Sequence, residues 1–311
     1  MSAESVLYLL VRLGAGTLAW VATYLVHSTV LLAGAWWAST RSASAQTREL
    51  LWRVALLGGL ATATLQATGA VPAAFTRVST GGLVEARHWS GQAPSAPVAS
   101  VQAPWGEAPS DGTSAPERYA SRLPSAGTVL RAVPLALVLA WMVFAGAMLA
   151  RLAFATRRAR RSMGRRRDVQ DPGVLALLRD ACARLGFRRP VRLTVSESLG
   201  TPVALGRAEI CLPRRALEEC SDEEMRAVLS HEVAHLVRHD PAWLLVSATM
   251  ESIFFFQPLN RAARIHLQEQ AEYLSDQLAV EHAGSLRLAL ARALAAVGGW
   301  LSAESEPLLA P

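Results

Sequence analysis

The sequence predicts a mainly α-helical fold with a small β-sheet, in which N-terminal transmembrane helices precede an α+β domain. Two observations support this prediction. Of the 311 residues, 51% are hydrophobic, and in the first half they fall in blocks as long as a membrane span. In the second half, helical periods with charged faces alternate with short apolar strands, a pattern typical of a packed domain beside the membrane.

The apolar blocks predict three transmembrane helices. The first block, 5–38, contains 34 residues. As one helix it would be about 51 Å long, which exceeds the roughly 30 Å of a bilayer core. We therefore place the first span at 17–38, with 6–13 as a tilted or interfacial extension. The second span fits 50–70 and the third fits 129–154.

Two polar side chains lie within these predicted spans. For His27 we expect a hydrogen bond to a neighbouring helix rather than a role as a ligand or proton carrier, because a polar group in a bilayer needs a partner. Arg53 is close enough to the end of the second span for its long side chain to reach the membrane surface.

Eight arginines and no acidic residue lie between 151 and 167, directly after the third span. Removing these eight from the formal net charge of +6 leaves −2, so the basic character is local. Arginines beside a span collect on the cytoplasmic side, which favours a topological signal over a nucleic-acid surface. We expect a multi-pass protein of the inner (plasma) membrane, with loop 39–49 and everything after 151 in the cytoplasm, the N-terminus outside and no direct nucleic-acid contact.

Residues 71–128, between the second and third spans, hold seven of the sixteen prolines among Ser, Ala, Gly and Gln. They show neither the period of a strand nor that of a helix, so we expect a disordered extracytoplasmic loop. The N-terminus carries Glu4 and no basic segment, so we expect no cleavable signal peptide.

After the arginines, Asp171 and Pro172 form an N-cap and first-turn pair for a helix that Gly186 closes. A strand over 191–195 follows. Residues 201–213 then predict a hairpin whose edge either receives an extended peptide or is covered by the fold. The three cysteines, Cys182, Cys211 and Cys220, are odd in number and lack C-x-x-C spacing, which predicts free thiols in a reducing compartment.

The most informative stretch runs from Ser221 to Asp240. Ser221 and Glu224 form a capping box, and apolar residues then recur at helical intervals until Asp240 and Pro241 end the run. Two further apolar runs, 241–258 and 285–300, are interrupted by charges. We expect them to be helices packed in the domain or lying at the membrane surface rather than further spans.

The helix over 221–240 carries the spacing of a zinc site. His231 and His235 are four residues apart and therefore share one face, with Glu232 beside them, so the letters HEVAH match H-E-x-x-H. Two neutral imidazoles suit zinc, whose fourth position in catalytic sites is kept for water. We expect Glu232 to take the proton of that water.

A third ligand must come from another segment. Residues 267–280 have a helical pattern in which Glu272 and Asp276 are four apart and share a face. We expect Glu272 to be the third ligand and Asp276 to hold one of the ligand imidazoles as a hydrogen-bond acceptor. Glu269 lies near the same face, and from these residues alone the choice between Glu269 and Glu272 stays open.

The run HEVAHLVRHD, then FFFQPL at 254–259 and AEYLSD at 271–276, in that order and spacing, resembles the BlaR/MecR type of membrane zinc peptidase. The segment TPVALGRAEICLP at 201–213 is similar to the hairpin that precedes the zinc helix in that family. The resemblance implies that Zn²⁺ is held by His231, His235 and Glu272. It also implies Glu232 as the general base and Asp276 as the outer acid.

The expected organisation is a membrane anchor, 1–156, followed by a cytoplasmic gluzincin-like zinc metalloprotease domain, 157–311. The expected function is that of an endopeptidase that cleaves a cytoplasmic or membrane-proximal protein or peptide, for which the resemblance implies a transcriptional repressor or the chain itself. Membrane lipid is the other expected partner. An HtpX-type quality-control protease and a non-catalytic membrane scaffold are the alternatives. Antibiotic sensors of this type carry a C-terminal penicillin-binding sensor domain that no segment here resembles, so we do not expect beta-lactam sensing.

Overall fold

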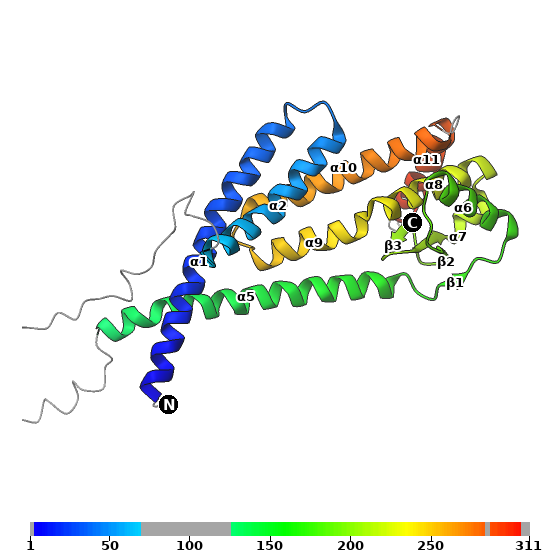
Figure 1. The fold of residues 1–311 in the computed structure, drawn as a ribbon. Helices are drawn as coiled ribbons and strands as arrows, with labels where there is room; N and C mark the ends of the chain where they lie inside the picture. Colours follow the sequence, from blue (N-terminus) through cyan, green and yellow to red (C-terminus); the bar gives the residue numbers. More distant parts are fainter. Residues whose placement is uncertain (1–2, 70–125, 284–286, 306–311) are drawn as a thin grey trace, which may run out of the picture. The chain divides into compact units, whose positions relative to one another are not determined.

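The computed structural model describes residues 3–69, 126–283 and 287–305, and within them the predicted fold class is confirmed (Figure 1). The N-terminal helices are α1 (Ala3–Ser39), α2 (Ala45–Ala67) and α5 (Ala126–Ser162). They are followed by β1 (Arg167–Asp168), α6 (Pro172–Arg184), β2 (Arg192–Ser196), β3 (Val203–Leu205), β4 (Glu209–Pro213), α7 (Arg214–Glu219), α8 (Asp222–Arg238), α9 (Asp240–Ile253), α10 (Pro258–Ala283) and α11 (Arg287–Ser305). Of the predicted loop 71–128, residues 71–125 lie outside the described part of the chain, and the remainder begins α5.

The chain divides into two compact units. The parts of α1 up to Thr23 and of α5 up to Met142 belong to the first unit, and the remaining described residues belong to the second. This division does not fall at 156–157, where the sequence predicts the boundary between membrane anchor and protease domain. That boundary stays a prediction. The second unit holds all the predicted site residues.

Three described helices are long and apolar enough to cross a membrane, namely Tyr8–Ser39, Ala45–Ala67 and Ala132–Ser162. Their number matches the prediction, but each is longer than its predicted span. α1 continues without a break through the expected extension. α2 begins earlier because Ser44 caps it by accepting a hydrogen bond from the backbone N–H of Thr47. α5 continues as a helix through most of the arginine cluster.

Close packing joins the first two helices. A Cβ atom on Gly59 would lie 2.8 Å from the Cα of Ser28, so only glycine permits this approach. His27 Nδ1 lies 3.0 Å from Thr62 Oγ1, which confirms the predicted contact with a neighbouring helix. That Arg53 reaches the membrane surface stays a prediction. Its guanidinium pairs with Glu49 on its own helix and with Asp240, because these carboxylates lie within its reach.

The sheet has the strand order β1-β2-β4-β3. β2 and β4 are parallel, whereas β3 and β4 form the predicted antiparallel hairpin around Gly206, whose φ of 58° suits glycine. β3 therefore lies at an edge of the sheet. The predicted helix caps are also present, because Asp171 accepts from the backbone N–H of Gly173 at 2.7 Å. The short strand β1, which was not predicted, pairs with β2.

The core of the domain lies between the sheet and the helices around it. Leu193, Ile210 and Leu212 from the strands pack with Leu229 and Val233 of α8, and all five are buried. α11 contributes Ala293 and Trp300 to the same cluster, so the run 285–300 forms a packed helix where it is described. These contacts fix α8 between the sheet and its covering helices.

α9 and α10 form a hairpin that runs from the domain to α1 (Figure 1). The predicted helix over 241–258 ends at Ile253 because the chain turns there. Asn260 exchanges hydrogen bonds with the Tyr24 hydroxyl, and the Phe254 ring stacks on Tyr24 with centroids 3.7 Å apart. Gln257 Nε2 donates to Ser28 Oγ at 2.9 Å. The turn therefore contacts the middle of the candidate span Tyr8–Ser39.

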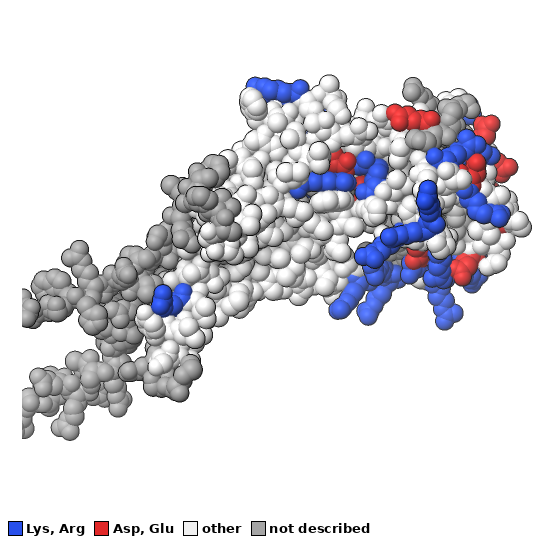
Figure 2. Space-filling view, viewed as in Figure 1, with Lys and Arg blue, Asp and Glu red and all other residues white. Residues whose placement is uncertain are grey.

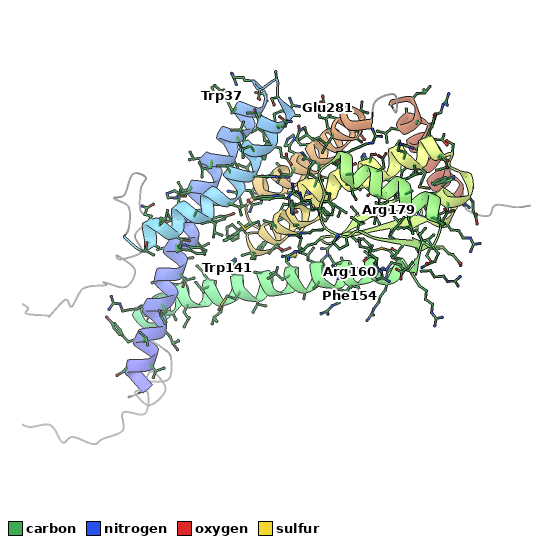
Figure 3. The ribbon with its side chains drawn as sticks, turned by 45° about the vertical axis from the view of Figure 1, so that its right-hand side comes forward. Trp37, Trp141, Phe154, Arg160, Arg179 and Glu281 are labelled. Atoms are coloured by element: carbon green, nitrogen blue, oxygen red, sulfur yellow. The ribbon has the colours of Figure 1, made fainter. Side chains whose placement is uncertain are left out.

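Charge is unevenly distributed over this unit. Figure 2 shows basic side chains gathered around the end of α5 and the segment that leads to β1, whereas the visible face over α9 and the middle of α5 is mostly uncharged. Phe154 and Arg160 project from α5 away from the other helices (Figure 3). At the end of α1, the Arg41 guanidinium lies 3.9 Å over the ring of Trp37. Aromatic and basic side chains at the ends of spans are typical of a membrane interface.

Candidate metal centre

α8 positions three of the predicted site residues. Its N-terminus has the predicted capping box, in which the backbone N–H of Ser221 donates to Glu224 Oε2 at 2.9 Å and the backbone N–H of Glu224 faces Ser221 Oγ at 3.4 Å. His231 and His235 then project from one side of the helix, about one turn apart, as the i and i+4 positions of a helix require. Glu232 is buried beside them, with 6% of its surface exposed.

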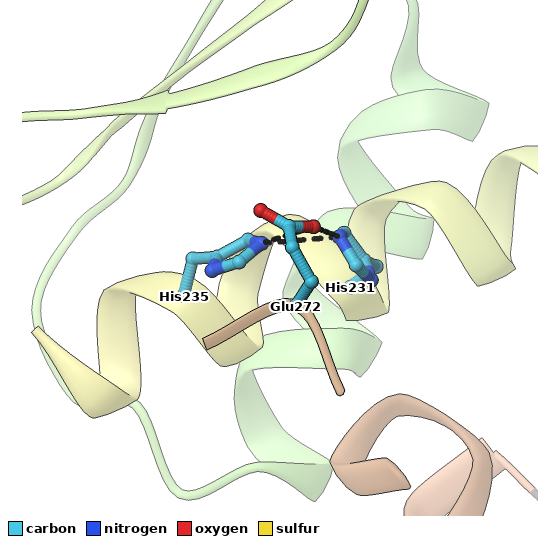
Figure 4. Close-up of side chains that lie close together, drawn as sticks. All are labelled: His231, His235 and Glu272. Atoms are coloured by element: carbon cyan, nitrogen blue, oxygen red, sulfur yellow. Dashed lines mark hydrogen bonds and ion pairs between the residues drawn. The ribbon is translucent and has the colours of Figure 1, made fainter. Parts of the chain in front are cut away.

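The two imidazoles and Glu272 of α10 converge on one point (Figure 4). His231 Nε2 and His235 Nε2 are 3.0 Å apart. Glu272 Oε2 lies 3.7 Å from the first and 3.8 Å from the second. The rival Glu269 instead contacts His266 Nδ1 at 3.2 Å. The sequence left open whether Glu269 or Glu272 is the third ligand. The structure brings Glu272, and not Glu269, to the imidazoles.

The opposite ring nitrogens face carboxylates. His231 Nδ1 lies 2.8 Å from Asp276 Oδ1, although the two groups fall short of a well-aligned hydrogen bond. His235 Nδ1 lies 2.9 Å from Asp240 Oδ2. Asp240 accepts a hydrogen bond at His235 Nδ1, and the Asp276 carboxylate lies next to His231 Nδ1. From these partners we infer that each Nδ1 carries the proton and each Nε2 carries a lone pair.

These observations test whether a metal ion fits. Two Nε2 lone pairs that face each other at 3.0 Å would repel, unless a cation or a proton lies between them. Two imidazole nitrogens and one carboxylate oxygen are the donor set of catalytic zinc, and nitrogens at this separation can both lie about 2.0–2.1 Å from one ion. Orientation of both imidazoles by carboxylates is also characteristic of zinc ligands. The residues present therefore fit zinc.

Asp240 was missed as a site residue by the sequence analysis, which used it only to end a helix. It is 2% exposed, and its Oδ2 also accepts from Ser275 Oγ at 3.3 Å and from Arg238 Nε at 3.2 Å. Its position depends on His239, whose left-handed backbone with φ 60° turns the chain between α8 and α9. An acid five residues after the second histidine, next to a helix end, was the available signal.

The electrostatics of the centre shift two pKa values. Burial raises the pKa of Glu232, while the nearby imidazoles and a backbone hydrogen bond at Ala204 of β3 partly oppose the shift. Burial lowers the pKa of His231, but Asp276, Glu232 and Glu272 together raise it more, so the net shift is upward. A buried carboxylate that holds a proton more readily than usual suits proton transfer near neutral pH.

A cavity of about 350 Å³ opens onto these groups. The edge strand β3 and the residues before it contribute to its lining, together with apolar side chains of α11. The lining comprises Thr201, Pro202, Val203, Ala204, Val228, His231, Glu232, His235, Asp240, Pro241, Leu244, Glu272, Leu290, Ala293 and Val297.

The sequence also matches known proteins. Residues 70–309 match the family described as BlaR1 peptidase M56. The methicillin resistance mecR1 proteins of Staphylococcus aureus and Staphylococcus epidermidis are each 22% identical to this chain over 93 residues. That segment covers 29% of this chain and only 16% of each relative. Because the family match runs over most of the chain, and the fold combines candidate spans with a His-His-Glu group, the chain belongs to the BlaR1 peptidase M56 family of BlaR/MecR-type membrane metallopeptidases.

Proposed function

We propose that this chain is a zinc-dependent endopeptidase, with His231, His235 and Glu272 as the zinc ligands and Glu232 as the general base. The observation that carries this proposal is one cavity in which three ligand atoms meet beside a buried carboxylate. Metal-assisted hydrolysis requires both a metal with an open position and a base that can take a proton from water.

The side chains have separate tasks in this proposal. A zinc ion held by the three ligands would act as a Lewis acid that polarises a carbonyl and acidifies water. Glu232 takes a proton from the attacking water and later delivers it to the leaving amine. Asp276 and Asp240 hold the imidazoles of His231 and His235 so that each presents Nε2 to the site.

The edge strand supports a path for the substrate. Val203 and Ala204 of β3 line the cavity, and β3 has one neighbour in the sheet, so its other edge can pair with an extended peptide. Ala204 also contacts Glu232 through its backbone, which places that edge next to the base. Leu290, Ala293 and Val297 of α11 provide an apolar wall. These contacts favour a peptide with an apolar side chain near the cut.

The proposed substrate is a cytoplasmic or membrane-proximal protein, either a transcriptional repressor, as the resemblance to BlaR/MecR peptidases implies, or the chain itself. The arginines at the end of α5 support a cytoplasmic catalytic domain on a membrane anchor, with 1–156 and 157–311 as the proposed parts. The buried Glu232 in the cavity favours a working protease over a scaffold.

Glu232→Gln tests the proposal. The amide keeps the shape of the side chain and leaves the three ligands in place, but it cannot accept a proton from water. We expect the variant to stay in the membrane, to hold about one zinc per chain as the wild type does, and to cleave about 10²–10⁴-fold more slowly. New protein N-termini in cells that carry each form are the measurement. Glu269→Gln changes a nearby carboxylate of α10 outside the site and is the matched control.

The outcomes separate the alternatives. Equal cleavage by Glu232→Gln and wild type would show that Glu232 is not the base. If both forms hold zinc and neither cuts any protein, the scaffold alternative is favoured. Cleavage of many unrelated membrane proteins by the wild type would favour the quality-control alternative, whereas one or two Glu232-dependent cuts support a regulatory protease.

A further inference from the structure

Four charged side chains connect α2 with the end of the zinc helix. Glu49 and Arg53 lie on α2, Arg238 is the last residue of α8, and Asp240 is the first of α9. Arg238 Nη2 donates to Glu49 Oε1 at 2.6 Å, and Arg53 pairs with Glu49. Arg53 Nη2 lies 3.5 Å from Asp240 Oδ1, and Arg238 Nε lies 3.2 Å from Asp240 Oδ2. We call these four residues the α2 network.

The α2 network is largely withdrawn from solvent. Its side chains are exposed by only 9% for Glu49, 20% for Arg53, 14% for Arg238 and 2% for Asp240. The charges of the two carboxylates and the two guanidinium groups cancel, and each carboxylate contacts both guanidinium groups. Charges buried in this way depend on their partners far more than surface pairs do, so removal of one member disturbs the others.

The network ends on the metal centre. Asp240 uses its two oxygens differently, because Oδ1 faces Arg53 of α2 whereas Oδ2 contacts His235 Nδ1 at 2.9 Å. The Arg53 guanidinium is itself held 4.6 Å over the ring of Trp243, in the first turn of α9. The rotation of the Asp240 carboxylate, and with it the direction of the His235 ring, therefore depends on side chains of a candidate membrane span.

We propose that Glu49 and Arg53 are positioning residues for the metal centre, which act through Asp240 to hold His235 in its metal-binding orientation. This inference rests on the proposed role of His235 as a ligand. The second candidate span would then contribute to the geometry of the site. A displacement of α2 would move His235 through two contacts, that of Arg53 with Asp240 and that of Asp240 with His235.

The test measures metal binding in the purified full-length chain in detergent. Zinc affinity is determined by competition with a chelator, and cobalt is used as a probe because its visible spectrum reports ligand geometry. Outer partners of metal ligands typically contribute 10- to 100-fold in affinity, so we expect a loss in that range for Arg53→Gln, with an altered cobalt spectrum. Glu49→Gln, which leaves Arg53 and Asp240 in place, should show the same effects to a smaller degree.

Arg48→Gln is the matched control. Like Arg53, Arg48 is an arginine of α2 that contacts another helix. It donates to Gln270 Oε1 of α10 at 3.3 Å and is outside the α2 network. We expect its zinc affinity and cobalt spectrum to equal those of the wild type. Melting temperatures of all variants, measured with zinc removed, separate loss of the fold from loss of the site.

A double variant tests the route. If Arg53 acts through Asp240, then Arg53→Gln combined with Asp240→Asn should bind zinc no more weakly than Asp240→Asn alone. Additive losses would overturn the proposed route. Should Arg53→Gln not fold, Glu49→Gln decides, and an affinity within twofold of the wild type overturns the inference. Absence of zinc from the wild type would instead contradict the proposed function, so the two failures are distinguishable.

Discussion

At the scale of single residues, His231 shows how neighbours prepare a ligand. The ring is buried against three carboxyl groups, Asp276, Glu232 and Glu272, which favour its protonated form. When the ring is neutral, the same carboxylates give the site a negative charge, which favours binding of a cation. Protons and zinc therefore compete for His231 Nε2, and the surroundings increase the attraction of both.

On acidification, zinc affinity should begin to fall at a higher pH than it would if His231 had the ordinary pKa of a histidine. The folded-state pKa of His231 is raised above 6.5, so protonation stabilises the metal-free fold at low pH, and this contribution is lost as the pH rises through the raised pKa. Zinc must displace that proton, so its apparent affinity should begin to decline above pH 6.5. Chelator competition between about pH 5.5 and 8.5, in the range where histidine titrates, is the measurement. An affinity that stays constant down to pH 6.5 would contradict the shift.

The site residues differ in how far the sequence could predict them. His231, Glu232 and His235 follow from a local motif, because helix geometry alone places positions i and i+4 together. The choice of Glu272 over Glu269 depends on how α10 packs against α8, and the residues alone left it open. Asp240 was missed because its role depends on the left-handed turn at His239, which no residue type requires.

At the scale of elements, local signals predicted α6, the β3–β4 hairpin and α8 well. Capping side chains at Asp171 and Ser221 and the turn at Gly206 act within a few residues, so their effect can be predicted from the sequence. The hairpin of α9 and α10 was predicted only in part. Its turn contacts α1 through Asn260 and Gln257, and such distant pairs leave no periodic pattern in the sequence.

Gly59→Ala should destabilise the packing of α1 against α2. The new Cβ would meet the Cα of Ser28 at 2.8 Å, and backbone cannot move aside as a flexible side chain can. We expect a loss of about 1–3 kcal/mol in the free energy of unfolding, the usual range for an overpacked contact. Gly34→Ala is the control, because among the described residues its Cβ would meet no atom within 4 Å other than its chain neighbours and the nearby backbone of its own helix. Thermal unfolding in detergent is the measurement, and equal melting temperatures for the two variants would refute the close approach.

At the scale of the whole molecule, the distribution of arginines bears on orientation. The end of α5 carries several exposed arginines and the turn between α1 and α2 carries the exposed Arg41, whereas the middles of the candidate spans are mostly apolar. Basic residues beside spans remain on the cytoplasmic side. The candidate metal centre follows α5 in the chain, so we expect it on that side as well.

A reporter inserted after Gly164 should therefore be cytoplasmic, and one inserted after Gly106 should be extracytoplasmic. Gly164 is exposed between α5 and β1, so an insertion there leaves the sheet intact. Paired enzyme reporters that are active on only one side of the membrane provide the measurement. The reverse result would place the catalytic domain outside the cell and would exclude a cytoplasmic repressor as substrate.

The hydrogen bond between Tyr24 and Asn260 also constrains the order of events during synthesis. The two residues are 236 positions apart, and at typical rates of translation the second emerges on the order of ten to fifty seconds after the first. During that interval the first span is in the membrane without its Asn260 partner, and Ser28 lacks Gln257. A chain that stops before the α9–α10 turn therefore contains the first candidate span without these two contacts, which only the later part of the domain can supply.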